Sequence, residues 1–276
     1  MAHPRRESVA VPHAVAVLST TRGSGATLLT AAAGLLIDDA VGRVGQSVIL
    51  MDADIDGGGL TTLTRSWNTT CAALDDGLLG FAGDDVELAG RDLARYLRHV
   101  HTGARRRQDM VLFPLGPGDK PGERLPTDGT LEEVVGTAVD RLVELGGCLI
   151  VDCGDSRTQV TLEVCHRVEH IILVGQLGPE GGEETGRLLS WLADRGLGAK
   201  VIGWVCNSPS AERSPTADPA GVGAPLMRLP YDTFAAATVA VGTLPDGTSP
   251  LLLTLCAQLR ALWPDVLNDG GWGRDE

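Results

Sequence analysis

The stretch VAVLSTTRGSGATLLTAAAGLLI, residues 15–37, decides the fold that this sequence predicts. It opens with a short apolar run, VAVL, which is typical of a buried β-strand. Gly23 and Gly25 then mark a turn, and a long apolar segment with helical character follows from Ala26. A strand, a glycine turn and a helix in this order can surround a phosphate with backbone N–H groups, although they can also form a tight strand-to-helix connection.

The turn lacks one component of a phosphate-binding loop. Such a loop carries a lysine that reaches the outer phosphates, and next to it a hydroxyl residue that binds Mg²⁺. Here the lysine position is Ala26 and the hydroxyl residue is Thr27. The turn therefore offers an anion-binding backbone and a hydroxyl group without the cation.

Length, charge and cysteine content exclude several classes of protein. The 276 residues suit one large α/β domain. A formal charge of −13 argues against non-specific DNA binding, which depends on lysine and arginine. The six cysteines form no C-x-x-C pair, and no apolar run reaches the roughly 20 residues of a membrane span. We expect a cytoplasmic protein with reduced, mostly buried thiols and no signal peptide.

Short apolar runs alternate along the chain with longer helical patterns, and this alternation predicts an α/β fold. The sheet should be doubly wound and mostly parallel, with helices on both faces, because its strands are nearly continuous apolar runs. The predicted strands are Ala14–Ser19, Ser47–Met51, Met110–Phe113, Cys148–Val151, His170–Val174, Val201–Cys206 and Leu226–Leu229. The predicted helices are Ala26–Asp39, Asp85–His99, Leu131–Leu145, Thr158–Val168, Glu183–Arg195, Thr233–Val241 and Pro250–Trp263.

A single domain is expected over residues 14–265, between an N-terminal arm (residues 1–13) and an acidic flexible tail (residues 266–276). Two stretches rich in Pro, Gly and Ser, residues 114–129 and 207–225, are predicted to be surface loops. The sequence after Trp263 is acidic, is broken by proline and glycine, and lacks the Lys/Arg face of an interfacial helix. We therefore expect no direct membrane anchor.

Carboxylates follow two of the predicted strands. Asp52 and Asp54 come after the strand Ser47–Met51, and three glycines follow them. Asp152 comes directly after the strand Cys148–Val151. Because ligands of a parallel sheet bind beyond the carboxyl ends of the strands, we expect these side chains to lie near the glycine turn, where they could hold Mg²⁺.

These motifs together resemble the ParA/MinD family of deviant-Walker P-loop ATPases, from Val15 to about Leu262. The family pattern KGGxGKTT falls on TRGSGATL, residues 21–28, and its DxD pair falls on Asp52 and Asp54. The Walker B pattern DxPxG falls on DCGDS, which starts at Asp152 and lacks the proline and the final glycine. The late strand that ends in asparagine is matched by VIGWVCN, and the hP-x-D element by LPYD, residues 229–232.

The resemblance implies ATP and Mg²⁺ as ligands and gives each matched residue a role. Asp54 would be the catalytic residue that orients the attacking water. Thr27, Asp54 and Asp152 would hold the metal, directly or through water. Asn207 would recognise the adenine, and the backbone at Pro230 would flank the base. The full predicted nucleotide-binding set is Arg22, Gly23, Ser24, Gly25, Ala26, Thr27, Leu28, Asn207 and Pro230.

Both lysines of the family motif are absent, since Ala26 replaces the inner one and Thr21 the signature one. Losing one charge-assisted contact removes roughly 1.5–3 kcal/mol, so binding should be weak, and hydrolysis should suffer more. Arg22 is either a substitute cation or a solvated loop residue. A loop that keeps GxGAT without lysine looks most like the CpaE/TadZ branch, which is associated with positioning pilus or septum machinery.

Two further features have alternative interpretations. Arg91, Arg95 and Arg98 share a face of the predicted helix Asp85–His99, and residues 105–107 add three arginines. This basic patch could dock an acidic partner, lipid headgroups or DNA, or it could be a solvated helix face. His99 and His101 have an H-x-H spacing without an evident third metal ligand.

Three functions fit the sequence. The first is an ATP-responsive, dimeric positioning or scaffold protein with weak or absent hydrolysis. It would recruit a protein partner of a pilus, secretion or division apparatus, and would itself reach the membrane only through a partner. The second is a nucleotide-free pseudo-ATPase that acts as an interaction module. The third is an ATP-dependent metabolic enzyme on the same scaffold, for which no second catalytic constellation is evident.

Overall fold

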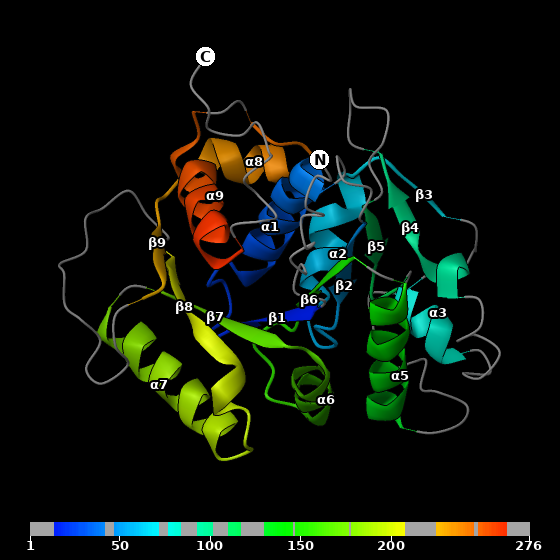
Figure 1. The fold of residues 1–276 in the computed structure, drawn as a ribbon, viewed down its shortest axis with the longest axis horizontal. Coiled ribbons are helices and arrows are strands. Elements are labelled where there is room, and N and C mark those ends of the chain that lie inside the picture. The colour runs from blue at the N-terminus through cyan, green and yellow to red at the C-terminus, as the bar shows by residue number, and fades with distance from the viewer. Residues whose placement is uncertain are drawn as a thin grey trace, which may run out of the picture.

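The protein is described here from a computed structural model that defines residues 14–41, 47–71, 77–83, 93–101, 110–116, 130–145, 147–176, 178–207, 225–245 and 248–263. These residues build one nine-stranded sheet in the order β3-β4-β5-β2-β6-β1-β7-β8-β9 (Figure 1). The strands are β1 Ala14–Ser19, β2 Val48–Asp52, β3 Thr69–Cys71, β4 Arg98–Val100, β5 Val111–Phe113, β6 Cys148–Asp152, β7 His170–Gln176, β8 Val201–Asn207 and β9 Met227–Leu229.

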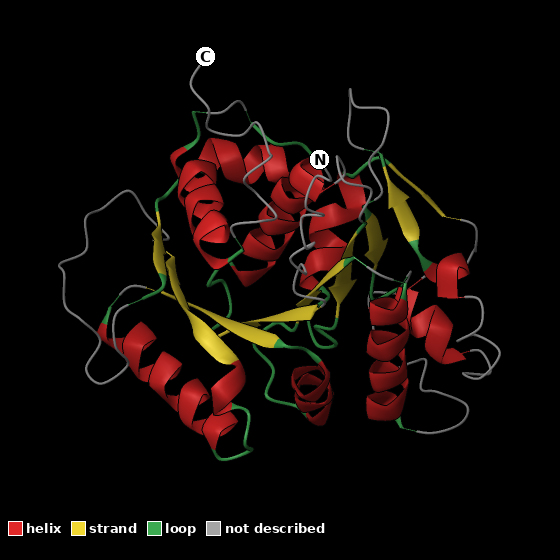
Figure 2. Ribbon diagram, in the orientation of Figure 1, coloured by secondary structure: helices red, strands yellow, loops and turns green. Residues whose placement is uncertain are grey.

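Helices cover both faces of the sheet (Figure 2). In Figure 1, α1, α2, α8 and α9 lie on one side, and α3, α5, α6 and α7 lie on the other. Their bounds are α1 Ala26–Val41, α2 Gly59–Leu63, α3 Gly77–Gly83, α5 Leu131–Glu144, α6 Gln159–Arg167, α7 Pro179–Ala193, α8 Thr233–Ala240 and α9 Pro250–Leu262. The prediction of a doubly wound, mostly parallel sheet is confirmed.

The sheet separates two hydrophobic cores, and the alternation of side chains along β1 shows how. Val15 and Val17 pack into the core under α1, α8 and α9. Ala16 and Leu18 point the other way, into the core under α3, α5, α6 and α7. Every residue of β1 is buried, which explains why this strand reads as an uninterrupted apolar run.

All seven predicted strands form; the bounds of β1 are as predicted, and those of the other six differ by one or two residues. Six of the seven predicted helices also form. A capping box precedes α5, since Glu133 N donates to Thr130 Oγ1 (3.3 Å) and Thr130 N donates to Glu133 Oε2 (2.8 Å). The cysteines at positions 148, 153, 165, 206 and 256 are free and buried.

The predicted helix Asp85–His99 is wrong in the part that the structure describes. A short 3₁₀ turn over Leu93–Tyr96 is followed by β4, which pairs antiparallel with both β3 and β5. Pairing at the sheet edge overrides the local helical pattern. Arg95 and Arg98 therefore do not share a helix face, and the Arg95 guanidinium lies 5.1 Å from the centre of the Tyr96 ring. Arg91 and residues 105–107 lie outside the described residues.

Several other sequence predictions fall wholly or largely outside the described ranges. These are the N-terminal arm, the acidic tail and most of the two predicted loops. His99 lies on β4, and His101 Nε2 is 2.9 Å from Thr70 Oγ1 in a hydrogen bond. None of the helices that the structure describes combines the length and apolar character of a bilayer span.

Candidate functional site

The loop between β1 and α1, residues 20–25, has the backbone shape of an anion-binding loop. Gly23 has a φ of +79° and Gly25 has a φ of +90°, values that side-chain-bearing residues rarely adopt. Ser19 Oγ donates to Thr21 O, so the 2.6 Å contact between the Ser19 and Ser24 hydroxyls has Ser24 as donor. α1 begins directly after Gly25, and its first N–H groups lack partners within the helix, as at any helix N-terminus.

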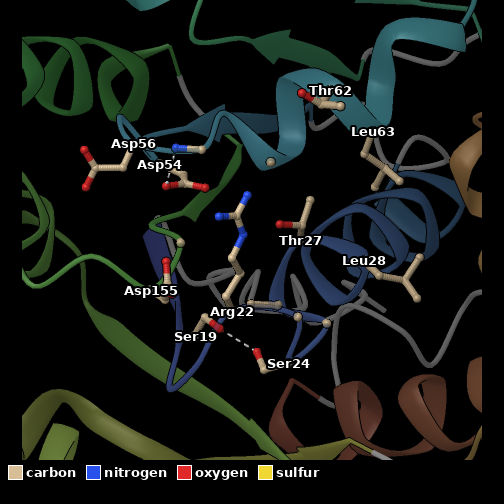
Figure 3. Close-up of a pocket in the computed structure, with 16 residues that line it drawn as sticks. Ser19, Arg22, Ser24, Thr27, Leu28, Asp54, Asp56, Thr62, Leu63 and Asp155 are labelled. Atoms are coloured by element: carbon tan, nitrogen blue, oxygen red, sulfur yellow. Dashed lines mark hydrogen bonds between the residues drawn. The ribbon is translucent and has the colours of Figure 1, made fainter. Parts of the chain in front are cut away.

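This β1–α1 loop forms one wall of a cavity of about 500 Å³ (Figure 3). Residues 22–28 line this wall, together with Ser19. Opposite it lie Asp54, Asp56 and nearby glycines from the segment after β2, and Gly154 and Asp155 from the segment after β6. Thr62 and Leu63 of α2 complete the lining. The cavity therefore lies beyond the carboxyl ends of β1, β2 and β6, where a parallel sheet binds ligands.

Asp52 is buried, and its carboxylate is fully engaged with the protein. Its Oδ2 accepts hydrogen bonds from Thr61 N and Thr61 Oγ1, both at 2.6 Å, and its Oδ1 accepts one from Asp54 N at 3.1 Å. Burial, reinforced by the nearby charge of Asp152, raises the pKa of Asp52 to about 7. The Thr61 hydroxyl in turn accepts a hydrogen bond from Leu115 N, so Asp52 joins three segments and acts structurally.

Asp152 differs from Asp52 because one of its carboxylate oxygens accepts no hydrogen bond from the described residues. Its Oδ1 accepts a hydrogen bond from Gly154 N at 3.2 Å, while Oδ2 is buried without a hydrogen-bond partner among the described residues. Burial raises the pKa of Asp152 to about 6, although the nearby Thr27 hydroxyl and Gly154 N oppose the rise. A buried carboxylate oxygen without a partner is costly, and a cation at this position would relieve the cost.

Asp54 faces the β1–α1 loop from the segment after β2. Gly57 N donates to its Oδ1 at 3.1 Å, and burial raises its pKa. Glycines permit the close approach: a Cβ on Gly154 would lie 2.4 Å from Asp54 Cγ, and one on Gly59 would lie 2.6 Å from Thr27 Oγ1. Thr27, Asp54 and Asp152 therefore lie near one another, and their oxygens are of the kind that Mg²⁺ prefers.

Arg22 is the only cation among the described residues that line the cavity. Figure 3 shows its side chain extending from the β1–α1 loop toward Asp54 and the Thr27 hydroxyl. Three carboxylates, those of Asp54, Asp56 and Asp155, line the same cavity. The carboxylates outnumber the one guanidinium, so the cavity repels anions. An anionic ligand would therefore need to bind together with a divalent cation.

Comparisons with known proteins identify the fold but not the family. No protein-family model and no curated protein matches this sequence. A ParA family ATPase from Chlorobium tepidum TLS superposes with a TM-score of 0.68 at 15% identity, covering 90% of this chain and 97% of its own. The septum site-determining protein MinD from Pyrococcus horikoshii OT3, complexed with Mg-ADP, gives 0.63 at 15% identity, covering 91% and 95%. A MinC:MinD complex from Aquifex aeolicus gives 0.60 at 14% identity, also covering 91% and 95%.

The chain has the ParA/MinD fold.

Within this ParA/MinD fold, the structure gathers most of the predicted site residues around one cavity. Residues 22–28 and Asp54 line it. Asp152 is buried and does not line it, but it lies near Thr27 and Asp54, which do. Asn207 and Pro230, the predicted base-binding residues, do not line it. The Asn207 side chain instead donates from Nδ2 to Ser24 O at 2.8 Å.

Sequence reasoning missed several residues of the cavity in this ParA/MinD fold. Asp155 lies within the quoted stretch DCGDS, so it could have been noted beside Asp152. Asp56 gave no separate signal, and it accepts a hydrogen bond from Ser156 Oγ across the two segments. Thr62 and Leu63 belong to the short helix α2, which the sequence analysis did not predict.

Proposed function

We propose that this chain is an ATP-responsive, dimeric positioning protein of the ParA/MinD type, with weak or absent hydrolysis. The observation that carries the proposal is the buried Asp152 Oδ2, which accepts no hydrogen bond from any residue that the structure describes. It lies near Thr27 and Asp54, which line a cavity with an anion-binding loop. A carboxylate kept in this state costs stability, and a bound cation–phosphate ligand would offset the cost.

Thr27, Asp54 and Asp152 would hold Mg²⁺, directly or through water. When bound, the cation would neutralise charge on the phosphates and on the surrounding carboxylates. The chain's own residues would bind the phosphates and orient the water. The N–H groups of Gly23 and of residues 25–28 would bind phosphate oxygens, whereas Ser24 N already donates to Thr21 O at 3.1 Å. Asp54 would orient a water molecule. The MinD neighbour complexed with Mg-ADP supports this choice of ligands.

We expect weak hydrolysis because Ala26 occupies the position of the missing lysine. Ala26 is 4% exposed and packs in the core under α1, so no cation extends from the position of the missing lysine. Stabilisation of developing charge is most of what a phosphoryl-transfer site supplies, and one lost cation lowers turnover more than binding.

A titration of nucleotide against oligomeric state tests the proposal. We expect ATP with Mg²⁺ to shift the protein from monomer to dimer in light scattering, with little phosphate release in parallel. EDTA should remove both the binding and the shift, because the cavity carries too many carboxylates to accept a bare triphosphate. Fast phosphate release would contradict the account of the lysine losses.

Arg22 is proposed to supply the missing positive charge. The Arg22→Ala variant should bind ATP–Mg²⁺ about tenfold more weakly, the equivalent of one charge-assisted contact in isothermal calorimetry. Arg22→Lys should keep part of the affinity because it retains the charge. Unchanged affinity in Arg22→Ala would show that Arg22 is a solvated loop residue.

The finer parts of the proposal concern location and partners. We place the chain in the cytoplasm as a homodimer, on the CpaE/TadZ branch, with its domain spanning residues 14–265. It would recruit a protein of a pilus, secretion or division apparatus. The MinC:MinD complex among the structural neighbours supports a protein partner.

A second candidate is a nucleotide-free pseudo-ATPase that serves as an interaction module. Ala26 and the excess of carboxylates over Arg22 in the cavity favour it. Absence of binding at millimolar ATP, with and without Mg²⁺, would select this alternative. The observation against it is Asp152 Oδ2, which has no hydrogen-bond partner within the described part of the chain.

A further inference from the structure

Helix α8 and the residues that flank it carry a stripe of exposed apolar side chains. Tyr231 is 48% exposed, Phe234 67% and Val241 54%, and Ala237 is exposed as well. Phe234, Ala237 and Val241 are spaced three and four residues apart, so they lie along one face of the helix, and Tyr231 precedes this face. These four side chains form the α8 stripe.

The opposite face of α8 is apolar too. Ala235 and Val239 pack there in the core under α1, α8 and α9, on one side of the sheet (Figure 1). No residue of α8, Thr233–Ala240, carries a charge. A surface helix usually presents charged side chains to water, and an outward face that is apolar instead is typical of an interaction site.

Hydrogen bonds at both ends fix the backbone that carries the α8 stripe. At the N-terminus, the Asp232 carboxylate accepts hydrogen bonds from Ala235 N at 2.9 Å and from Ser249 Oγ at 2.7 Å. At the C-terminus, Trp67 Nε1 donates to Val239 O at 3.0 Å. A surface on a fixed backbone loses little conformational entropy when it binds, so more of the contact energy appears as affinity.

The C-terminus of α8 is also connected to a wall of the cavity. Ser66 Oγ donates to Ala240 O at 2.6 Å. Ser66 ends the 3₁₀ turn Thr64–Ser66, which directly follows α2, and Thr62 and Leu63 of α2 line the cavity. The cavity wall and α8 are therefore joined by a short piece of chain and a hydrogen bond.

The α8 stripe begins at the same edge of the sheet as the cavity. β9 is parallel to β8, with Leu229 opposite Asn207, and Tyr231 follows the carboxyl end of β9 by two residues. β9 lies three strands from β1, about 14 Å at the usual strand spacing. A standard interface covers about 800 Å² of each partner, roughly 30 Å across. An interface over the cavity is therefore wide enough to reach Tyr231 and Phe234.

Charge determines where two copies of this chain can touch. The chain has a formal charge of −13, and Asp54, Asp56 and Asp155 line the cavity together with Arg22. Two copies that meet at this edge repel each other until cations neutralise the carboxylates. An uncharged apolar surface beside the cavity supplies attraction without adding to the repulsion. A second copy therefore fits both the position and the neutral character of the α8 stripe.

We propose that the α8 stripe is a contact surface for a second copy of this chain, and that its burial supplies the attraction in the dimer that ATP–Mg²⁺ permits. The inference rests on the proposed function and deepens it by naming side chains of the dimer interface. Bound cations lower the repulsion between the two cavity edges, and Tyr231 and Phe234 then leave water. Exposed aromatic side chains on a fixed backbone are typical of the residues that dominate interface energies.

Variants at Phe234 test the inference by sedimentation equilibrium with ATP–Mg²⁺. Phe234→Ala should raise the dimer dissociation constant at least about thirtyfold, because both copies lose the side chain. Phe234→Asp should raise it at least about a hundredfold, because it also adds a negative charge to each copy. Both variants should still bind ATP–Mg²⁺ in calorimetry, since Phe234 does not line the cavity.

Two controls separate a lost contact from a damaged fold. Phe234→Asp should unfold in urea at the wild-type concentration or a higher one, because an acidic residue in the first turn stabilises a helix. Leu145→Ala removes an apolar side chain that is 50% exposed at the end of α5, on the other side of the sheet. It should dimerise as the wild-type protein does.

Hydrogen exchange identifies what covers the α8 stripe. With ATP–Mg²⁺, the amides of α8 should gain protection only at protein concentrations at which the dimer forms. Faster exchange of α8 in monomeric Phe234→Asp than in the monomeric wild-type protein would overturn the inference. It would show that another segment of the same chain covers the stripe.

The oligomeric state distinguishes failure of the inference from failure of the proposed function. A Phe234→Asp protein that dimerises with ATP–Mg²⁺ as tightly as wild type would overturn the inference and leave the proposed function intact. A wild-type protein that stays monomeric with and without nucleotide would overturn both. A dimer that forms equally well without nucleotide and is lost in Phe234→Asp would support the α8 stripe as the interface and overturn its control by ATP–Mg²⁺.

Discussion

Replacing Gly25 by alanine is expected to abolish measurable binding of ATP–Mg²⁺, with a loss of at least about a hundredfold. The added methyl group would sit 2.3 Å from Asn207 Nδ2, and it would force an L-residue into a φ of +90°. The backbone strain costs about 1–2 kcal/mol, and displacing Asn207 breaks its hydrogen bond to Ser24 O. The N–H groups of the loop would then no longer converge on one point, so several charge-assisted hydrogen bonds to phosphate would be lost at about 1.5–3 kcal/mol each.

Gly196→Ala is the matched control for this prediction. Gly196 follows α7 with a φ of +74°, and no atom lies within 4 Å of the position of an added Cβ. It carries a similar backbone strain outside the cavity, so it should lose about 1 kcal/mol of stability and keep nucleotide affinity. Both quantities can be measured by calorimetry and urea unfolding. Retained affinity in Gly25→Ala would contradict the role of the β1–α1 loop as the phosphate site.

The Asp152→Asn variant should bind nucleotide more weakly while its metal-free form becomes more stable. Affinity for ATP–Mg²⁺ should fall by about a hundredfold, because a neutral amide replaces a carboxylate ligand of the cation. The metal-free protein should become more stable at pH 8, because the substitution removes a buried charge whose Oδ2 has no partner among the described residues. A residue whose replacement stabilises the ligand-free protein but weakens ligand binding is typical of a functional site.

The pH dependence of this stability difference follows from the pKa of Asp152, which burial raises from 3.8 to about 6. The Asp152 carboxyl binds its proton more tightly in the folded state than in the unfolded state. Protonation therefore stabilises the folded protein fully below about pH 4, and this stabilisation is lost as pH rises through about 6. Asp152→Asn should therefore gain up to about 3 kcal/mol over wild type at pH 8, and nearly none near pH 4.

Urea unfolding in EDTA at both pH values measures the difference. Asp194→Asn, at the exposed end of α7, is the control and should change neither stability nor binding. A gain of equal size at pH 4 and pH 8, or a loss at pH 8, would contradict the assignment of an unsatisfied buried carboxyl.

The local sequence determined much of this fold. Strand–turn–helix order, the apolar character of β1 and the capping box of α5 depend on neighbours within a few residues, so they can be read along the chain. The positions of Asp54 and Asp152 could be predicted for a further reason. Parallel strands have their carboxyl ends at the same edge of the sheet, so residues that directly follow such strands lie at that edge.

Only the tertiary structure decided the contacts between distant segments. β4 is a strand because β3 and β5 pair with it, although its local pattern is helical. The Asn207 amide holds Ser24 O, 183 residues earlier in the chain, and the position predicted for base recognition is thereby used to hold the loop. That Asp152 Oδ2 finds no hydrogen-bond partner in the described ranges likewise depends on which groups surround it after packing. Periodicity and turn residues encode local conformation, whereas the pairing of side chains across the sheet follows from the packed geometry of the whole fold.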